Sequence, residues 1–158
     1  MTARPQPQPA PSGSLYERDI VAWSEQQASL LRAGRLAELD IANIAEEFED
    51  VGKGERRELA NRMAVHLAQL LKCQHQPQRR CRSLEAAIRH RRERILRRLG
   101  SDPSLKSSLA DPDWWLDAWG DARLQIAEET GIGFDTLPSD CPWTADQILD
   151  ASFWPETP

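Results

Sequence analysis

The sequence has no long hydrophobic run and little cysteine. No stretch of about 18 consecutive apolar residues is present, so we expect no segment to span a membrane. The first residues also lack the apolar core of a secretory signal. The three cysteines, Cys73, Cys81 and Cys141, are odd in number and show no CxxC spacing. This argues against a disulfide framework and a zinc ribbon, and we expect reduced thiols in a cytoplasmic protein.

The alternation of apolar and polar residues that is typical of β-strands is also absent, and no internal repeat is evident. A chain of 158 residues is long enough to bury one core. The net charge of −5 is mild and does not by itself indicate a nucleic acid or an anionic membrane as partner. The start of the chain is rich in Pro, Gln and Ser. We therefore expect a disordered leader over residues 1–13 and a single all-helical domain over residues 14–158.

Apolar residues recur at helical spacing along most of the chain, which predicts an all-α helical bundle of six or seven helices. Capping boxes begin the first and last helices, at Ser14 with Glu17 and at Thr144 with Gln147. An aromatic tail, Phe153-Trp154-Pro155, is expected to fold back onto the bundle. The expected helices cover residues 15–33, 41–51, 55–76, 84–99, 103–110, 112–130 and 145–149.

The segment from Glu55 to Gln76 is expected to be the central helix. Two adjacent apolar stripes cover most of its surface and leave only a narrow polar remainder. The preceding Gly52-Lys53-Gly54 is expected to turn the chain, so that the helices on either side are antiparallel neighbours. We expect the central helix to be enclosed on nearly every side, with no room for a groove. His66 lies among its apolar residues and is expected to be buried and hydrogen-bonded.

Several motifs occur in an order and spacing that resemble a known family. They are LYERDIVAW, IAEEFEDVGKGERREL, HLAQLLKCQHQPQRR and CPWTADQILD. Together they cover most of the chain from about residue 15 to residue 155, and they resemble the bacterial family catalogued as domain of unknown function 29. The resemblance implies a compact all-helical fold. It implies no activity, because no mechanism or catalytic residue is associated with that family.

An arginine-rich segment, residues 79–98, is the strongest charge feature, with nine arginines against two glutamates. A basic helix can bind a phosphate backbone or an acidic protein. Its charge is spread around the helix and no aromatic residue is interleaved, which favours internal ion pairs or a solvated face. Trp114 lies off the buried stripe of its own helix and is expected to be exposed. The candidate partner-binding residues are Arg89, Arg91, Arg92, Arg94, Arg97 and Trp114.

Acidic residues gather before the central helix, and Glu46, Glu47 and Asp50 are weak candidates for metal ligands together with His66. Carboxylates paired at i, i+3 lie on one side of a helix. However, neither the Glu-x-x-His pairs of di-metal bundles nor an HExxH motif is present. Ion pairing with nearby basic residues is the favoured interpretation, and no catalytic residue is expected.

Three functional hypotheses remain open from the sequence. The favoured one is a small cytoplasmic bacterial protein that acts as a helical interaction or regulatory module for an unknown, acidic protein partner. The second is nucleic-acid binding through residues 79–98, and the third is a metal-dependent enzyme that uses Glu46, Glu47, Asp50 and His66. We expect no cofactor and no membrane association. Enzymatic activity stays open, and its absence is the favoured interpretation. The partner and the oligomeric state are not determined by the sequence.

Overall fold

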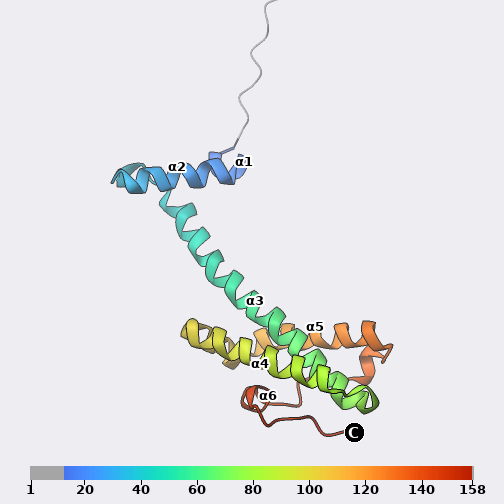
Figure 1. The fold of residues 1–158 in the computed structure, drawn as a ribbon. Helices are drawn as coiled ribbons and strands as arrows, with labels where there is room; N and C mark the ends of the chain where they lie inside the picture. Colours follow the sequence, from blue (N-terminus) through green and yellow to red (C-terminus); the bar gives the residue numbers. More distant parts are fainter. Residues whose placement is uncertain (1–12, 158) are drawn as a thin grey trace, which may run out of the picture. The chain divides into compact units, whose positions relative to one another are not determined.

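Six α-helices and four 3-10 helices make up residues 13–157, which the computed structural model describes, and this part of the chain contains no strand (Figure 1). The predicted all-α fold is therefore confirmed. The predicted leader lies outside the described residues, apart from Gly13. The α-helices are α1 (Leu15–Arg18), α2 (Ile20–Arg32), α3 (Ile41–His75), α4 (Arg82–Ser101), α5 (Pro112–Thr130) and α6 (Ala145–Leu149). The 3-10 helices are Leu36–Glu38, Pro77–Arg79, Pro103–Ala110 and Phe134–Thr136.

The first predicted helix is divided into α1 and α2 at Asp19. The predicted capping box of Ser14 and Glu17 is present at the start of α1. Asp19 then leaves the helical conformation, with φ −153° and ψ 87°, and its carboxylate accepts a hydrogen bond of 3.0 Å from the backbone N–H of Ala22. Aspartate is favoured at such N-caps because its carboxylate accepts a hydrogen bond from a backbone N–H that has no carbonyl acceptor within the helix. The break therefore starts a new helix with its own cap.

The predicted turn at Gly52-Lys53-Gly54 is wrong, because α3 continues through it as one helix of 35 residues. The backbone of Gly52 and of Gly54 stays outside the left-handed region, which among the described glycines only Gly13, Gly34 and Gly131 adopt. Each glycine in a helix interior costs about 1 kcal/mol relative to alanine. The flanking Lys, Glu and Arg residues are good helix formers, and no proline interrupts the segment. The helices predicted on either side are thus parts of α3 and not antiparallel neighbours.

The chain divides into two compact units, one up to Val51 and one from Gly52 onwards. We call them the N-terminal unit and the C-terminal unit, and each is described by itself. The prediction of a single domain over residues 14–158 stays a prediction.

The N-terminal unit is held together by aromatic and polar contacts. The Tyr16 hydroxyl donates a hydrogen bond of 2.8 Å to Glu47, which raises the pKa of Tyr16 to about 12. Trp23 is buried against Tyr16, with 4.8 Å between the ring centroids, and its indole N–H donates to Asp40. The Gln27 side chain accepts from the backbone N–H of Asp40. Most of the large apolar side chains in this unit remain exposed: Ile20, Val21, Leu31, Leu36, Ile41, Phe48 and Val51.

The C-terminal unit contains the main hydrophobic core. Figure 1 shows α4 and α5 crossing the C-terminal part of α3, and buried residues of all three helices belong to one cluster. Leu67 and Leu71 on α3 are fully buried, as predicted for the central helix. Helix α5 begins after Asp111, which caps it, and α6 begins at the predicted capping box of Thr144 and Gln147. Both helices match the predicted ranges.

The C-terminal segment folds back onto this core, as predicted for the aromatic tail. Phe153 and Trp154 are partly buried against the core cluster. The buried Arg92 guanidinium donates hydrogen bonds to three backbone carbonyls, those of Ile148 at 2.9 Å and of Ala151 and Phe153 at 3.1 Å each. A helix side chain thus satisfies the carbonyls of an irregular segment, which would otherwise be costly to bury.

Candidate functional site

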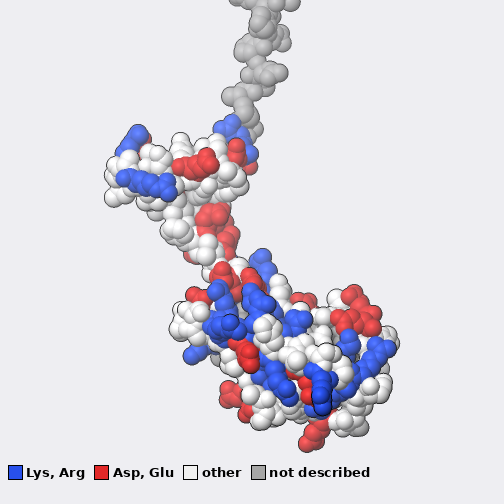
Figure 2. Space-filling model, in the orientation of Figure 1, with Lys and Arg blue, Asp and Glu red and all other residues white. Residues whose placement is uncertain are grey.

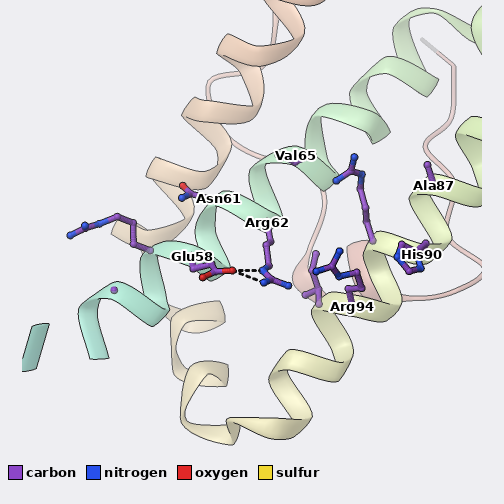
Figure 3. A pocket seen from close by; sticks show the side chains of 11 residues that line it. Glu58, Asn61, Arg62, Val65, Ala87, His90 and Arg94 are labelled. Atoms are coloured by element: carbon purple, nitrogen blue, oxygen red, sulfur yellow. Dashed lines mark hydrogen bonds and ion pairs between the residues drawn. The ribbon is translucent and has the colours of Figure 1, made fainter. Parts of the chain in front are cut away.

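A groove runs between α3 and α4 within the C-terminal unit, with a volume of about 670 Å³ (Figure 3). Helix α3 contributes residues at helical spacing from Gly54 to Val65, and α4 contributes residues from Ala87 to Ile95. The floor is apolar: Val65 and Ala87 are half-buried, and Ile95 is buried. The other lining residues are Arg57, Glu58, Asn61, Arg62, His90, Arg91 and Arg94. The prediction that the central helix leaves no room for a groove is therefore wrong.

The groove carries positive charge above this apolar floor. Arg62 donates two hydrogen bonds to one carboxylate oxygen of Glu58, at 2.9 Å and 2.5 Å, and these bonds lower the pKa of Glu58. By contrast, the exposed Arg57, Arg91 and Arg94 form no ion pair with any residue that the structure describes. Arg57 comes from α3 and the other two from α4. The arrangement suits a ligand that has an apolar face and negative charge on both sides of it.

Lys and Arg side chains also cover much of the face of the C-terminal unit that Figure 2 shows. Several of them are paired within the unit: Arg98 contacts Glu55 and Asp102, Arg80 contacts Glu85, and Lys72 contacts Glu129. The groove differs from this surrounding surface because its three exposed arginines form no ion pair within the described residues, and Glu58, the one carboxylate that lines the groove, is bonded to Arg62.

The structure places only two of the predicted partner-binding residues, Arg91 and Arg94, in the groove. Arg97 is exposed on α4 but does not line the groove. Arg89 lies 3.7 Å from Glu85, and its guanidinium stands over the Trp154 ring at 5.6 Å. Arg97 and Arg89 therefore belong to other parts of the surface of α4.

The remaining two predicted residues, Arg92 and Trp114, are buried. Arg92 is 2% exposed and its donors are used by the C-terminal segment. The predicted exposure of Trp114 is wrong: it is 8% exposed, and its indole N–H donates a hydrogen bond of 3.0 Å to the backbone carbonyl of Arg56. A buried tryptophan usually finds such a partner. Neither side chain is presented to a partner in this structure.

Sequence reasoning missed the contribution of α3 to the groove. Gly54, Arg57, Glu58, Asn61 and Val65 follow one face of the helix at spacings of three and four residues. This face is the narrow polar remainder of the central helix, interrupted by a single apolar residue. A polar stripe on an otherwise buried helix is a signal that one side of it faces solvent, and it could have been read from the sequence.

His66 is fully buried, as predicted, and lies outside the groove. Its Nε2 is 3.3 Å from the carbonyl oxygen of Ile148, so this nitrogen carries the hydrogen, because a carbonyl can only accept. Burial lowers the pKa of His66 to about 4. The imidazole is thus neutral near pH 7 and serves to hold α6 against α3.

The metal hypothesis finds no support in the geometry. Within residues 13–157, no group of three or more His, Cys, Asp or Glu side chains is placed to hold a metal ion. Glu47 instead accepts a hydrogen bond from Tyr16, and His66 contacts Ile148. The cluster of Glu46, Glu47, Asp50 and His66 therefore remains a weak candidate on sequence grounds alone.

Comparison with known proteins assigns the family. The model of the family described as Domain of unknown function DUF29 matches residues 15–154, and the chain belongs to this family. No curated protein and no solved structure matches the chain. Among the described residues, none of the helices combines the length and apolar character needed to cross a bilayer.

Proposed function

We propose that the protein is a helical interaction module whose groove between α3 and α4 holds an acidic helical segment of a protein partner. One observation carries the proposal: Arg57, Arg91 and Arg94 stand without carboxylate partners beside an apolar floor. Surface arginines without a partner are common, but here they flank a groove whose base is formed by the half-buried Val65 and Ala87 and the buried Ile95. Such a surface binds strongly only when both its charge and its apolar floor are matched.

The dimensions of the groove suit a helix. Residues 54–65 of α3 span about 16 Å at 1.5 Å per residue, which corresponds to roughly three turns of a bound helix. Amphipathic helices bind hydrophobic grooves through residues spaced at i, i+3, i+4 and i+7. An aliphatic stripe would pack on Val65, Ala87 and Ile95, while carboxylates on both sides of the stripe would reach the arginines of the two flanking helices.

An acidic protein fits the groove better than a nucleic acid does. Single-stranded nucleic acids bind grooves that combine basic side chains with aromatic rings for base stacking. No Phe, Tyr or Trp lines this groove, and its one ring is the imidazole of His90. A duplex needs a row of phosphate contacts and makes little use of an apolar floor. Binding to DNA or RNA is therefore the outcome that would contradict the proposal.

A cytoplasmic location in a bacterium is part of the same proposal. It is supported by the three cysteines, all of which are free in the structure. Free thiols are typical of a reducing compartment.

The proposal is tested with a labelled helical peptide of alanine, leucine and glutamate, in which leucine forms one stripe and glutamate flanks it. We expect the full chain to bind this peptide, with affinity that falls as salt increases. The double variant Arg91→Ala/Arg94→Ala should bind about 5- to 30-fold more weakly, if each pair contributes about 0.5–1 kcal/mol. Fluorescence anisotropy measures both quantities.

Two controls make the test specific. Arg97→Ala removes an exposed arginine of the same helix that does not line the groove, and it should leave the affinity unchanged. A peptide with lysine in place of glutamate should not bind. Equal loss of binding for the Arg97 variant would show that the groove is not the site. Preferential binding of a DNA duplex would show that the ligand is not an acidic protein segment.

A further inference from the structure

A second cleft lies in the C-terminal unit and shares no lining residue with the groove between α3 and α4. It has a volume of about 310 Å³, at the lower end of the range for small-molecule sites. Helix α5 contributes Trp115 and Trp119 to its lining, and the segment 139–145 contributes Trp143. Three of the six tryptophans of the chain therefore line one small cleft.

Contacts within the fold hold the indole rings of the cleft in place. The N–H of Trp115 donates a hydrogen bond of 2.8 Å to the carbonyl of Leu109. The N–H of Trp119 donates one of 3.0 Å to the carbonyl of Pro138. Trp119 and Trp143 stand nearly perpendicular, at 85°, with 6.0 Å between the ring centroids. This edge-to-face contact occupies at most one face of either ring, so the two rings can each turn a face towards the same ligand.

The charge of the cleft is negative. Asp140 is the only charged residue among those that line it. Its carboxylate is exposed, accepts a hydrogen bond of 2.9 Å from the Ser139 hydroxyl, and forms no ion pair with any residue that the structure describes. The thiol of Cys141, which also lines the cleft, adds no second negative charge near pH 7, because burial raises its pKa to about 11.

The face of an aromatic ring attracts cations, and among the aromatic side chains tryptophan does so most strongly. We propose that the cleft binds a small quaternary ammonium compound such as choline. The methyl groups of the ligand pack against the three indole rings, and Asp140 supplies the opposite charge. A quaternary nitrogen has no N–H, so aromatic walls leave no donor of the ligand without an acceptor.

The chain uses the same interaction internally at another tryptophan. The guanidinium of Arg80 stands over the Trp154 ring, 4.6 Å from its centroid. Within residues 13–157, no arginine stands over Trp115, Trp119 or Trp143 in this way. The rings of the cleft are therefore available to a cation from outside the chain.

The test titrates the isotope-labelled full chain with choline and follows the indole N–H signals by NMR. We expect the signals of Trp115, Trp119 and Trp143 to shift, whereas those of Trp23 and Trp154 should stay unchanged. The matched ligand is the neutral alcohol in which carbon replaces the nitrogen of choline. It has the same shape without the charge and should bind about tenfold more weakly or less tightly still.

Two positions separate the charge from the rings. Asp140→Asn should weaken choline binding about threefold or more and leave the binding of the neutral alcohol unchanged. Trp143→Leu should weaken choline binding about tenfold, and Trp143→Phe should weaken it less, because a phenyl ring attracts a cation less strongly than an indole. Asp135→Asn is the control, since it removes an exposed carboxylate that does not line the cleft. Circular dichroism checks that each variant is folded.

Several results would overturn the inference. They are the absence of binding at millimolar choline, equal binding of choline and the neutral alcohol, and equal weakening by Asp140→Asn and Asp135→Asn. A trimethyl-lysine peptide that binds more tightly than choline would assign the cleft to a protein partner and overturn the small-molecule ligand. None of these results bears on the groove between α3 and α4, whose test uses another ligand and other residues.

Discussion

Replacing Gly52 and Gly54 by alanine should stabilise the protein, because both glycines lie inside the continuous helix α3. A Cβ added at either position meets no atom within 4 Å, and neither residue has a positive φ. Each substitution should contribute about 0.8–1 kcal/mol through helix propensity. The free energy of unfolding of the double variant should therefore be higher by roughly 1.5–2 kcal/mol, and its melting temperature should rise by about 3–8 °C.

Circular dichroism at the helical band measures both the melting temperature and the helix content, which should also increase slightly. Gly131→Ala is the matched control, because a Cβ there also meets no atom within 4 Å, but its φ is +75°. An alanine in that left-handed conformation costs about 1–2 kcal/mol, so this variant should melt at a lower temperature. If Gly52→Ala/Gly54→Ala lowers the melting temperature as Gly131→Ala does, the two glycines form a turn, and the description of α3 as one helix is refuted.

Two further predictions concern the buried polar groups around α6. The pKa of His66 is about 4 in the folded chain and about 6.5 when unfolded, so its contribution to stability is complete above pH 6.5 and is lost as the pH falls towards 4. The free energy of unfolding, measured by urea denaturation, should fall by about 3 kcal/mol between pH 6.5 and pH 4, and His66→Gln should abolish this fall. If the free energy of unfolding of the variant depends on pH as steeply as that of the wild type, other groups cause the loss. Arg92→Met should cost about 2–4 kcal/mol, because three backbone carbonyls lose a charged donor. Amide hydrogen exchange near Phe153 should then become faster. The control Arg97→Met should change neither the stability nor this exchange. A cost below about 1 kcal/mol for Arg92→Met would contradict the view that Arg92 holds the C-terminal segment in place.

Local signals in the sequence were sufficient for the ends of several helices. Asp111 followed by Pro112 begins α5, and Thr144 with Gln147 begins α6, because in each case the cap is made by residues that are neighbours in the chain. The same local reasoning failed at Gly52 and Gly54. The free-energy cost of two glycines in a helix is small. The helical segments on either side therefore decide whether residues 52–54 form a turn or continue the helix.

The candidate site was harder to predict because it depends on contacts between distant residues. The burial of Arg92 requires the carbonyls of Ile148 to Phe153, and the burial of Trp114 requires the carbonyl of Arg56. None of these partners is close in sequence. Periodicity could place Arg91 and Arg94 on one side of α4, but only the packing of α4 on α3 shows that Arg57 faces the same groove.

The central claim is that the groove between α3 and α4 binds an acidic helix. The most direct test is an NMR titration of the isotope-labelled full chain with the designed glutamate-leucine peptide. We predict that the amide signals that shift belong to residues 54–65 of α3 and 87–95 of α4, which border the groove. Shifts confined to other surfaces, with the signals of Gly54, Ala87 and Ile95 unchanged at saturation, would contradict it.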